Sequence, residues 1–216
     1  MDLQIPYRHF DFIFNEEECE RILEKGKSIL KLQSRDQSSG KIYSDDSVQK
    51  TDAKVRNCEV CWLNEHWIYE RIHEIVNVAN HNAGWNWQID CVERLQFTKY
   101  DVGGHYSWHT DGGSDHHSVY TGSRAHDWTG KVRKISVTVN LSSANDYNGG
   151  ELMFFNPTYL SAYSEKMGES ETYTPKEVCD RGSAIVFPSF TPHKVSPITM
   201  GTRYSLVTWF LGQPWK

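Results

Sequence analysis

The chain has 216 residues, of which 38% are hydrophobic and 13% aromatic, a mixture typical of one folded domain with a full core. Its formal net charge of −5 argues against nucleic acid as the main partner, because phosphate binding needs a basic surface. No apolar run approaches the roughly 18 residues of a membrane helix, and the first residues lack the features of a secretory signal. We therefore expect a soluble, cytoplasmic protein without a membrane partner.

The cysteines support the same location. They are odd in number and sparse, and no export signal accompanies them, which favours reduced thiols over disulfides. Cys58 and Cys61 form a Cys-x-x-Cys pair, but no second pair follows at zinc-finger spacing. We expect both to be packed thiols without a metal or redox role.

Two amphipathic helices are predicted in the first part of the chain. The first covers Asn15 to Leu32 and uses Asn15 as its N-cap, followed by three acidic residues near the positive helix end. The second covers Leu63 to Ala83. Between them, Arg35 to Lys54 is polar with few anchors and is expected to be a mobile loop, and Val55 to Leu63 is expected to be a strand.

From about Trp85 the hydrophobic period changes to two, which indicates strands. The clearest alternation puts Ile135, Val137 and Val139 on one face of a single strand. The expected strands are Ile89–Tyr100, Tyr106–Asp111, Arg133–Leu141, Glu151–Phe155, Ser183–Phe187, Pro192–Ser196 and Thr202–Leu211. Helices followed by short strands with Gly, Asn and Pro between them indicate an all-β barrel or sandwich braced by helices.

We expect one domain over residues 1–216, with residues 1–85 as helical support and a mobile loop, and residues 86–216 as the strand-rich core. Gly112 to Lys131 has no clean period and follows Asp111 directly. Long loops of this kind are often lids or binding loops, so we expect it to hang over the site.

The segment His109-Thr110-Asp111 carries the most specific chemistry. On a strand, side chains repeat every two residues, so the imidazole and the carboxylate share a face. His193, much later in the chain, offers a third ligand. Two histidines and one carboxylate with other positions open suit non-haem Fe(II) that activates O2. The same ligands could hold Zn²⁺, but catalytic zinc usually has three protein ligands and a water for hydrolysis.

A single His-x-acid motif has little weight, since about one is expected by chance among the histidines and acids of this chain. A second copy, His9-Phe10-Asp11, is interpreted as a surface pair. Alone, His193 would be interpreted as a satisfied core histidine and Asp111 as a turn residue. Their occurrence in order with Arg203 favours a metal site.

Arg203 lies on the last predicted strand, where Ser205, Val207 and Trp209 share its face. If that face points inward, Arg203 is a buried cation that requires an anion. A cosubstrate carboxylate would supply the anion, and the arginine fork suits it. The alternative is an outward arginine in a surface ion pair.

At this point five ordered blocks resemble the 2-oxoglutarate- and Fe(II)-dependent oxygenases, and among them the prolyl-4-hydroxylase-like, or PKHD-type, hydroxylases. The blocks are Gln96–Asp111, Ile135–Ser142, Tyr147–Leu152, Arg181–Pro188 and His193–Ser205, and they span roughly residues 90–211. The resemblance implies a mainly β chain with a double-stranded β-helix, or jelly-roll, core and supporting helices.

The resemblance also implies the roles of individual residues. The iron ligands, and so the catalytic centre, would be His109, Asp111 and His193. The contacts to 2-oxoglutarate would be Arg203, Tyr100, Ser205 and Thr138, with Arg203 on the far carboxylate. The resemblance further implies O2 as a cosubstrate and ascorbate as a reductant.

The activity implied is oxidative decarboxylation of 2-oxoglutarate to succinate and CO2, coupled to hydroxylation of an unactivated C–H bond. The favoured substrate is a prolyl residue in a peptide or protein, with Tyr106, Trp209 and Arg124 as candidate contacts. A free amino acid, another side chain or a small metabolite are alternatives, and an alkylated nucleobase fits the charge less well. A non-catalytic jelly-roll binding module and a zinc hydrolase are the readings from other classes.

Overall fold

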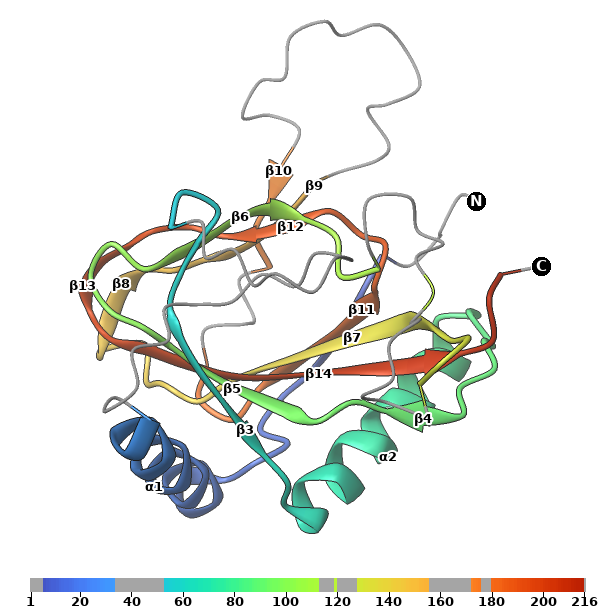
Figure 1. Ribbon diagram of the computed structural model, residues 1–216, viewed down its shortest axis with the longest axis horizontal. Helices are drawn as coiled ribbons and strands as arrows, with labels where there is room; N and C mark the ends of the chain where they lie inside the picture. The colour runs from blue at the N-terminus through green and yellow to red at the C-terminus, as the bar shows by residue number, and fades with distance from the viewer. Residues whose placement is uncertain are drawn as a thin grey trace, which may run out of the picture.

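The computed structural model describes residues 6–33, 53–112, 119, 128–155, 172–175 and 180–215. Two antiparallel sheets lie one above the other, and two helices cover the outer face of the larger sheet (Figure 1). The chain is therefore mainly β, with helices on one side, as the periodicity predicts. Most of the two loops expected at 35–54 and 112–131 lies outside the described residues.

The larger sheet has the strand order β1-β11-β7-β14-β5-β3, with β4 also paired to β14. These strands are β1 (Arg8–Phe10), β3 (Glu59–Leu63), β4 (Cys91–Val92), β5 (Leu95–Tyr100), β7 (Val132–Asn140), β11 (Ala184–Pro188) and β14 (Arg203–Gly212). The two longest strands, β7 and β14, lie side by side at the centre of this sheet.

The smaller sheet has the order β10-β9-β12-β6-β2. Its strands are β2 (Arg56–Asn57), β6 (His105–His109), β9 (Leu152–Phe155), β10 (Thr172–Tyr173) and β12 (His193–Val195). A separate pair joins β8 (Tyr147–Gly149) to β13 (Ile198–Gly201). Strands β6 and β12, which are far apart in the sequence, thus pair with each other (Figure 1).

Every strand expected from the sequence is present, but two are divided. The expected strand over residues 55–63 forms β2 and β3, which belong to different sheets, and the one over 89–100 forms β4 and β5. A further strand, β13, lies in the segment between the expected strands over residues 192–196 and 202–211. Strands β1, β8, β10 and β13 were not predicted, because each is too short to show a period of two.

Both predicted helices are confirmed within a few residues at each end. Helix α1 (Glu16–Gln33) begins with a reciprocal cap, in which Asn15 Oδ1 accepts from Glu18 N and Glu18 Oε2 accepts from Asn15 N, each at 2.9 Å. Helix α2 is His66–Asn82. Neither described helix combines the length and apolar character that a membrane crossing requires. The first 85 residues therefore supply both helices, and also β1, β2 and β3.

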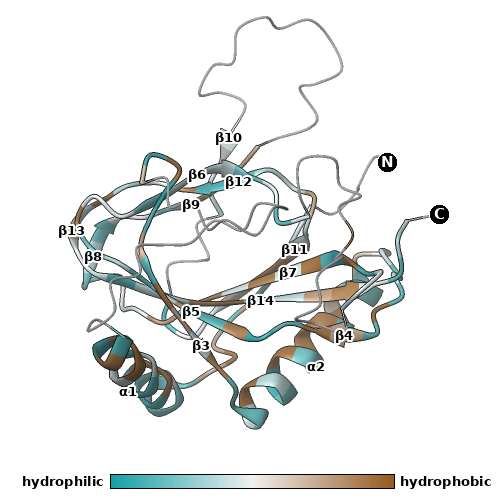
Figure 2. Cartoon of the chain, viewed as in Figure 1, coloured by the Kyte–Doolittle hydropathy of each residue, from teal (hydrophilic) through white to brown (hydrophobic). Residues whose placement is uncertain are grey.

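The two faces of the larger sheet differ in chemistry. On β7, Ile135, Val137 and Val139 belong to the main hydrophobic core with α1 and α2, as the alternation predicts. Their neighbours Ser136 and Thr138 are also buried, although they are polar. Because side chains alternate across a strand, these polar residues point to the space between the sheets. Figure 2 shows the apolar colour along β7 and on the helices beneath it.

Helix α1 approaches β5 closely at Gly26. A Cβ atom added at Gly26 would lie 2.6 Å from ring atoms of Phe97, which is itself fully buried. This glycine has no unusual backbone conformation to explain it, so the requirement is for space. The contact fixes the distance between the helix and the sheet that carries part of the site.

We expect Gly26→Ala to lower the free energy of unfolding by about 1–3 kcal/mol, because the new methyl group must displace the Phe97 ring. The sign of this change tests the contact, because alanine in a helix interior normally raises the free energy of unfolding by roughly 0.5–1 kcal/mol relative to glycine. Ser28→Ala, at an exposed position of the same helix, is the control and should change little. Urea denaturation measures both, and a stabilised Gly26→Ala variant would contradict the close contact.

Candidate metal centre

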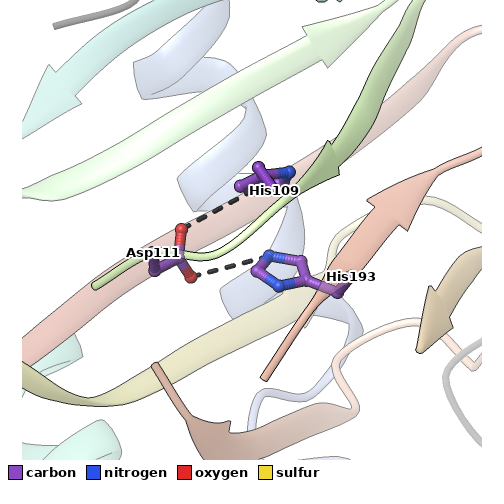
Figure 3. Close-up of side chains that lie close together, drawn as sticks. All are labelled: His109, Asp111 and His193. Atoms are coloured by element: carbon purple, nitrogen blue, oxygen red, sulfur yellow. Dashed lines mark ion pairs between the residues drawn. The ribbon is translucent and has the colours of Figure 1, made fainter. Parts of the chain in front are cut away.

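Three side chains from distant segments converge between the sheets. Strand β12 pairs with β6 so that His193 lies opposite His109, and Asp111 follows β6 by two residues. The Asp111 carboxylate faces both imidazoles, 3.7 Å from His109 Nε2 and 3.6 Å from His193 Nε2 (Figure 3). One ligand atom from each residue lies within 4.8 Å of the others. The three side chains that the sequence suggested as metal ligands thus lie together as a cluster in space.

No other group of three His, Cys, Asp or Glu side chains with this spacing occurs among the described residues. The second His-x-Asp copy also brings its two side chains together. His9 Nε2 lies 3.4 Å from Asp11 Oδ1; the Asp11 side chain is 65% exposed, as expected of a surface residue, but that of His9 is only 16% exposed. Among the described residues no third ligand joins this pair, whereas the triad has three.

Both histidines are oriented by the same backbone device. His109 Nδ1 lies 2.8 Å from the carbonyl oxygen of Ser107, and His193 Nδ1 lies 2.9 Å from that of Thr191. A carbonyl oxygen only accepts, so Nδ1 must carry the proton in each ring. The lone pair is then on Nε2, the atom that faces Asp111. This second partner on the remote nitrogen is typical of metal-binding histidines.

The ionisation of the triad also suits a metal. Burial, and then the neighbouring His193, lowers the pKa of His109 to about 3, so its imidazole is neutral near pH 7. Burial alone would raise the pKa of the Asp111 carboxyl, but His193, His109, Arg133 and the Ser136 hydroxyl outweigh it and lower that pKa. Neutral imidazoles and an ionised carboxylate are the forms that bind a divalent ion, so these residues fit Fe(II).

Aromatic rings fix the imidazoles from the outside. The ring of Tyr106 stacks on His109 with centroids 3.5 Å apart and planes 15° apart. His193 lies edge-on to Phe187, with centroids 4.9 Å apart, and near Phe154, at 6.1 Å. These contacts limit the rotation of both imidazoles and keep water from their sides. Tyr106, an expected substrate contact, therefore lies directly beside the triad.

Two serines hold Asp111. Ser136 Oγ donates to Asp111 Oδ2 at 2.7 Å and lies 2.9 Å from Ser189 Oγ. The Ser189 carbonyl accepts from the backbone N–H groups of Asp111 and Gly112, at 2.9 and 3.0 Å. The carboxylate is thus fixed through both its side chain and its backbone. Sequence reasoning missed both serines, although Ser136 stands on the polar face of the clearest predicted strand.

A partly buried ion pair supports the same turn. Arg133 Nη1 donates to the Asp111 carbonyl at 3.2 Å, and Arg133 Nη2 donates to Glu93 Oε2 at 2.7 Å. The guanidinium lies 3.9 Å from the ring centroid of Trp209. Trp209, expected as a substrate contact, is 6% exposed and packs on this arginine. Its Nε1 has no hydrogen-bond partner among the described residues.

Arg203 lies further along the space between the sheets. It opens β14 opposite Tyr100 of β5, and its guanidinium is 5.8 Å from the Tyr100 ring. Only 3% of Arg203 is exposed, so it points inward and is not part of a surface pair. Its guanidinium makes no ion pair with a described acid. A Cβ atom at Gly150 would lie 3.1 Å from Arg203 Cδ, so this glycine leaves room for the arginine.

The other expected site residues are placed or lie outside the described chain. Ser205 and Thr138 are buried on the two central strands, Ser205 opposite Thr98 and Thr138 opposite Val207. Arg124 and most of the expected lid fall outside the described residues. The expected packing of the Cys-x-x-Cys pair is confirmed, since neither cysteine forms a disulfide and both are buried, and burial raises the pKa of both thiols.

We expect Ser136→Ala to weaken Fe(II) binding by roughly 10- to 100-fold, because the Asp111 carboxylate loses the bond that orients it. Ser142→Ala is the matched control. Ser142 is a buried serine whose Oγ accepts a bond of the same 2.7 Å length from Tyr204 N, outside the triad. Anaerobic competition with a chelator measures both affinities. Equal affinity in the wild type and Ser136→Ala would remove Ser136 from the site.

The fold is similar to that of solved prolyl hydroxylases. A prolyl-4-hydroxylase of Pseudomonas putida superposes with a TM-score of 0.62 at 16% identity, over 96% of this chain and 93% of that one. A prolyl hydroxylase of Trichoplax adhaerens gives 0.64 at 17% identity, over 96% and 84%. These likenesses confirm the expected double-stranded β-helix core.

Curated relatives share part of the sequence. A PKHD-type hydroxylase of Gloeothece citriformis is 33% identical over 118 residues, which are 55% of this chain and 42% of that protein. One of Herminiimonas arsenicoxydans is 35% identical over 115 residues, which are 52% and 41%. The chain therefore spans less than half the length of these relatives.

A family model covers the strands that build the site. Residues 95–211, more than half of the chain, match the model of the 2OG-Fe(II) oxygenase superfamily. That span includes the triad, its supporting serines and Arg203. The family's cofactors, Fe(II), 2-oxoglutarate and O2, agree with a donor set of two imidazoles and one carboxylate. This chain belongs to the 2OG-Fe(II) oxygenase superfamily.

Proposed function

We propose that this protein is an Fe(II)- and 2-oxoglutarate-dependent oxygenase that hydroxylates a prolyl residue in a peptide or protein, with succinate and CO2 as co-products. The observation that carries the proposal is the pairing of a buried metal-type triad with a buried arginine that has no acidic partner among the described residues. A binding module has no need of both features. A hydrolytic zinc site has no need of the arginine.

Each residue has a task in this reaction. His109 Nε2, His193 Nε2 and the Asp111 carboxylate would hold Fe(II), which, when bound, supplies O2 activation and the oxidative decarboxylation of 2-oxoglutarate. Arg203 would bind the far carboxylate of 2-oxoglutarate as a charge-assisted fork, beside Tyr100. The rings around the imidazoles would keep water away from the reacting atoms.

The similarity of this fold to solved prolyl hydroxylases supports the prolyl substrate. The similar structures are named prolyl hydroxylases, and the one from Trichoplax adhaerens is described in complex with a peptide fragment of hypoxia inducible factor. In this chain Tyr106, an expected substrate contact, lies directly beside an expected iron ligand, where a substrate held for hydroxylation would have to approach. A free amino acid or small metabolite is the alternative within the class.

The test is anaerobic loading with Fe(II) and 2-oxoglutarate, followed by addition of O2 and measurement of succinate, with and without a library of proline-containing peptides. We expect succinate formation that a subset of peptides stimulates, with a mass gain of one oxygen on the proline. Asp111→Ala should abolish the succinate, because the metal loses its anionic ligand. Succinate without any peptide response would exclude the peptide substrate, and no succinate at all would exclude the oxygenase.

We expect Arg203→Ala to raise the 2-oxoglutarate concentration needed for half-maximal turnover by roughly 10- to 100-fold, since a buried charged hydrogen bond is lost. Fe(II) binding, measured separately by dialysis, should be unchanged, because Arg203 is not one of the triad. Loss of iron from Arg203→Ala would contradict its assignment to the cosubstrate.

A further inference from the structure

A second buried arginine, Arg56, lies beside the site. Arg56 and Arg203 are the two arginines that are buried among the described residues, at 8% and 3% exposure. Arg56 belongs to the edge strand β2, where it is paired in register with Tyr106. Both arginines act on Tyr100: burial raises the pKa of that phenol, and the two positive charges oppose this. Tyr100 therefore experiences two cations that come from opposite sheets.

The contacts of Arg56 lead directly to the triad. Its guanidinium carbon lies 4.7 Å from the ring centroid of Tyr106, and the other end of this stack is the His109 imidazole, 3.5 Å from Tyr106. Arg56 Nε donates to Cys58 Sγ at 2.9 Å. With Nε occupied, Nη1 and Nη2 form the free end of the fork, and no hydrogen bond joins them to a described residue. The Tyr106 ring thus separates the Arg56 guanidinium from His109, and the positive charge of Arg56 acts on both His109 and Tyr100. Of the two arginines, Arg56 is the one that contacts a neighbour of an expected metal ligand.

Arg56 has no counter-ion among the described residues. Other arginines do, since Arg133 pairs with Glu93 and Arg181 with Glu16. The Cys58 thiol is no substitute, because burial raises its pKa and keeps it neutral near pH 7, although Arg56 opposes this. A buried guanidinium without an anion is costly to maintain. Two such cations around one tyrosine indicate a ligand with two anionic groups.

We propose that Arg56 binds the carboxylate of 2-oxoglutarate next to the keto group, while Arg203 binds the far carboxylate. This rests on the proposed function. A carboxylate that gives one oxygen to a metal keeps the other free to accept a hydrogen bond, and Nη1 and Nη2 of Arg56 are the donors for it. The dicarboxylate would then have one arginine for each end.

The experiment separates the two ends with two probes. The protein is loaded with Co(II), and its visible absorption is followed during titration with 2-oxoglutarate or with pyruvate, a 2-oxo acid that lacks the far carboxylate. We expect Arg56→Gln to weaken both ligands by ~10- to 100-fold. Arg203→Gln should weaken 2-oxoglutarate alone. Arg94→Gln removes one positive charge at an exposed position and should change neither affinity.

Several outcomes would overturn the proposal. An unchanged 2-oxoglutarate affinity in Arg56→Gln would mean that Arg56 serves the substrate or only the Tyr106 ring. If Arg56→Gln lowered the affinity for 2-oxoglutarate but not for pyruvate, Arg56 would bind the far carboxylate and not the one next to the keto group. If the variant failed to bind Co(II), Arg56 would instead support His109. If Arg56→Gln fails to fold, Arg56→Lys decides, with at least a several-fold loss expected because the fork is gone. If the wild-type protein loaded with Co(II) bound neither 2-oxoglutarate nor pyruvate, the proposed function itself would be wrong.

Discussion

The pairing of β12 with β6 is the interaction on which the site depends. It sets His193 opposite His109 and brings both next to Asp111, although the two strands are separated by most of the core sequence. A shift of one residue would turn His193 to the other face of the sheet and leave two ligands in place of three. The neighbours Phe154 and Phe187 pack on His193 and favour the observed register. Packing of the smaller sheet and metal binding are therefore coupled.

The larger sheet supplies polar side chains to the site with one face and packs in the hydrophobic core with the other. One face of β7 packs on the helices, and the other carries Ser136 to the Asp111 carboxylate. Arg133 and Glu93 form a partly buried pair whose charges cancel, so this support adds no net charge beside the metal. Arg56 and Arg203 are different, because neither forms an ion pair with an acid among the described residues. We therefore propose that the paired arginine supports the site, whereas the two unpaired arginines recognise the cosubstrate.

The sequence predicted the triad and both helices, because each has a local signal: a period, a cap, or residue types that suit one chemistry. For Arg203 it left an inward and an outward position open, and the structure shows that Arg203 points inward. It did not predict Ser136, Ser189 or Glu93, whose roles exist only where strands from three parts of the chain meet. Arg56 lay just after a segment interpreted as a loop, in an expected strand that in fact divides between two sheets. Short edge strands have no period to read, so their residues were not assigned to the site.

The central claim is that His109, Asp111 and His193 together bind iron in this fold. X-ray absorption spectroscopy of the Fe(II)-loaded protein tests it directly, because imidazole, oxygen and sulfur neighbours scatter differently. We expect the iron to have two imidazole neighbours, with oxygen as all its other neighbours. In His193→Ala, iron that stays bound should have one imidazole neighbour. Sulfur neighbours, or a spectrum that His193→Ala leaves unchanged, would contradict it.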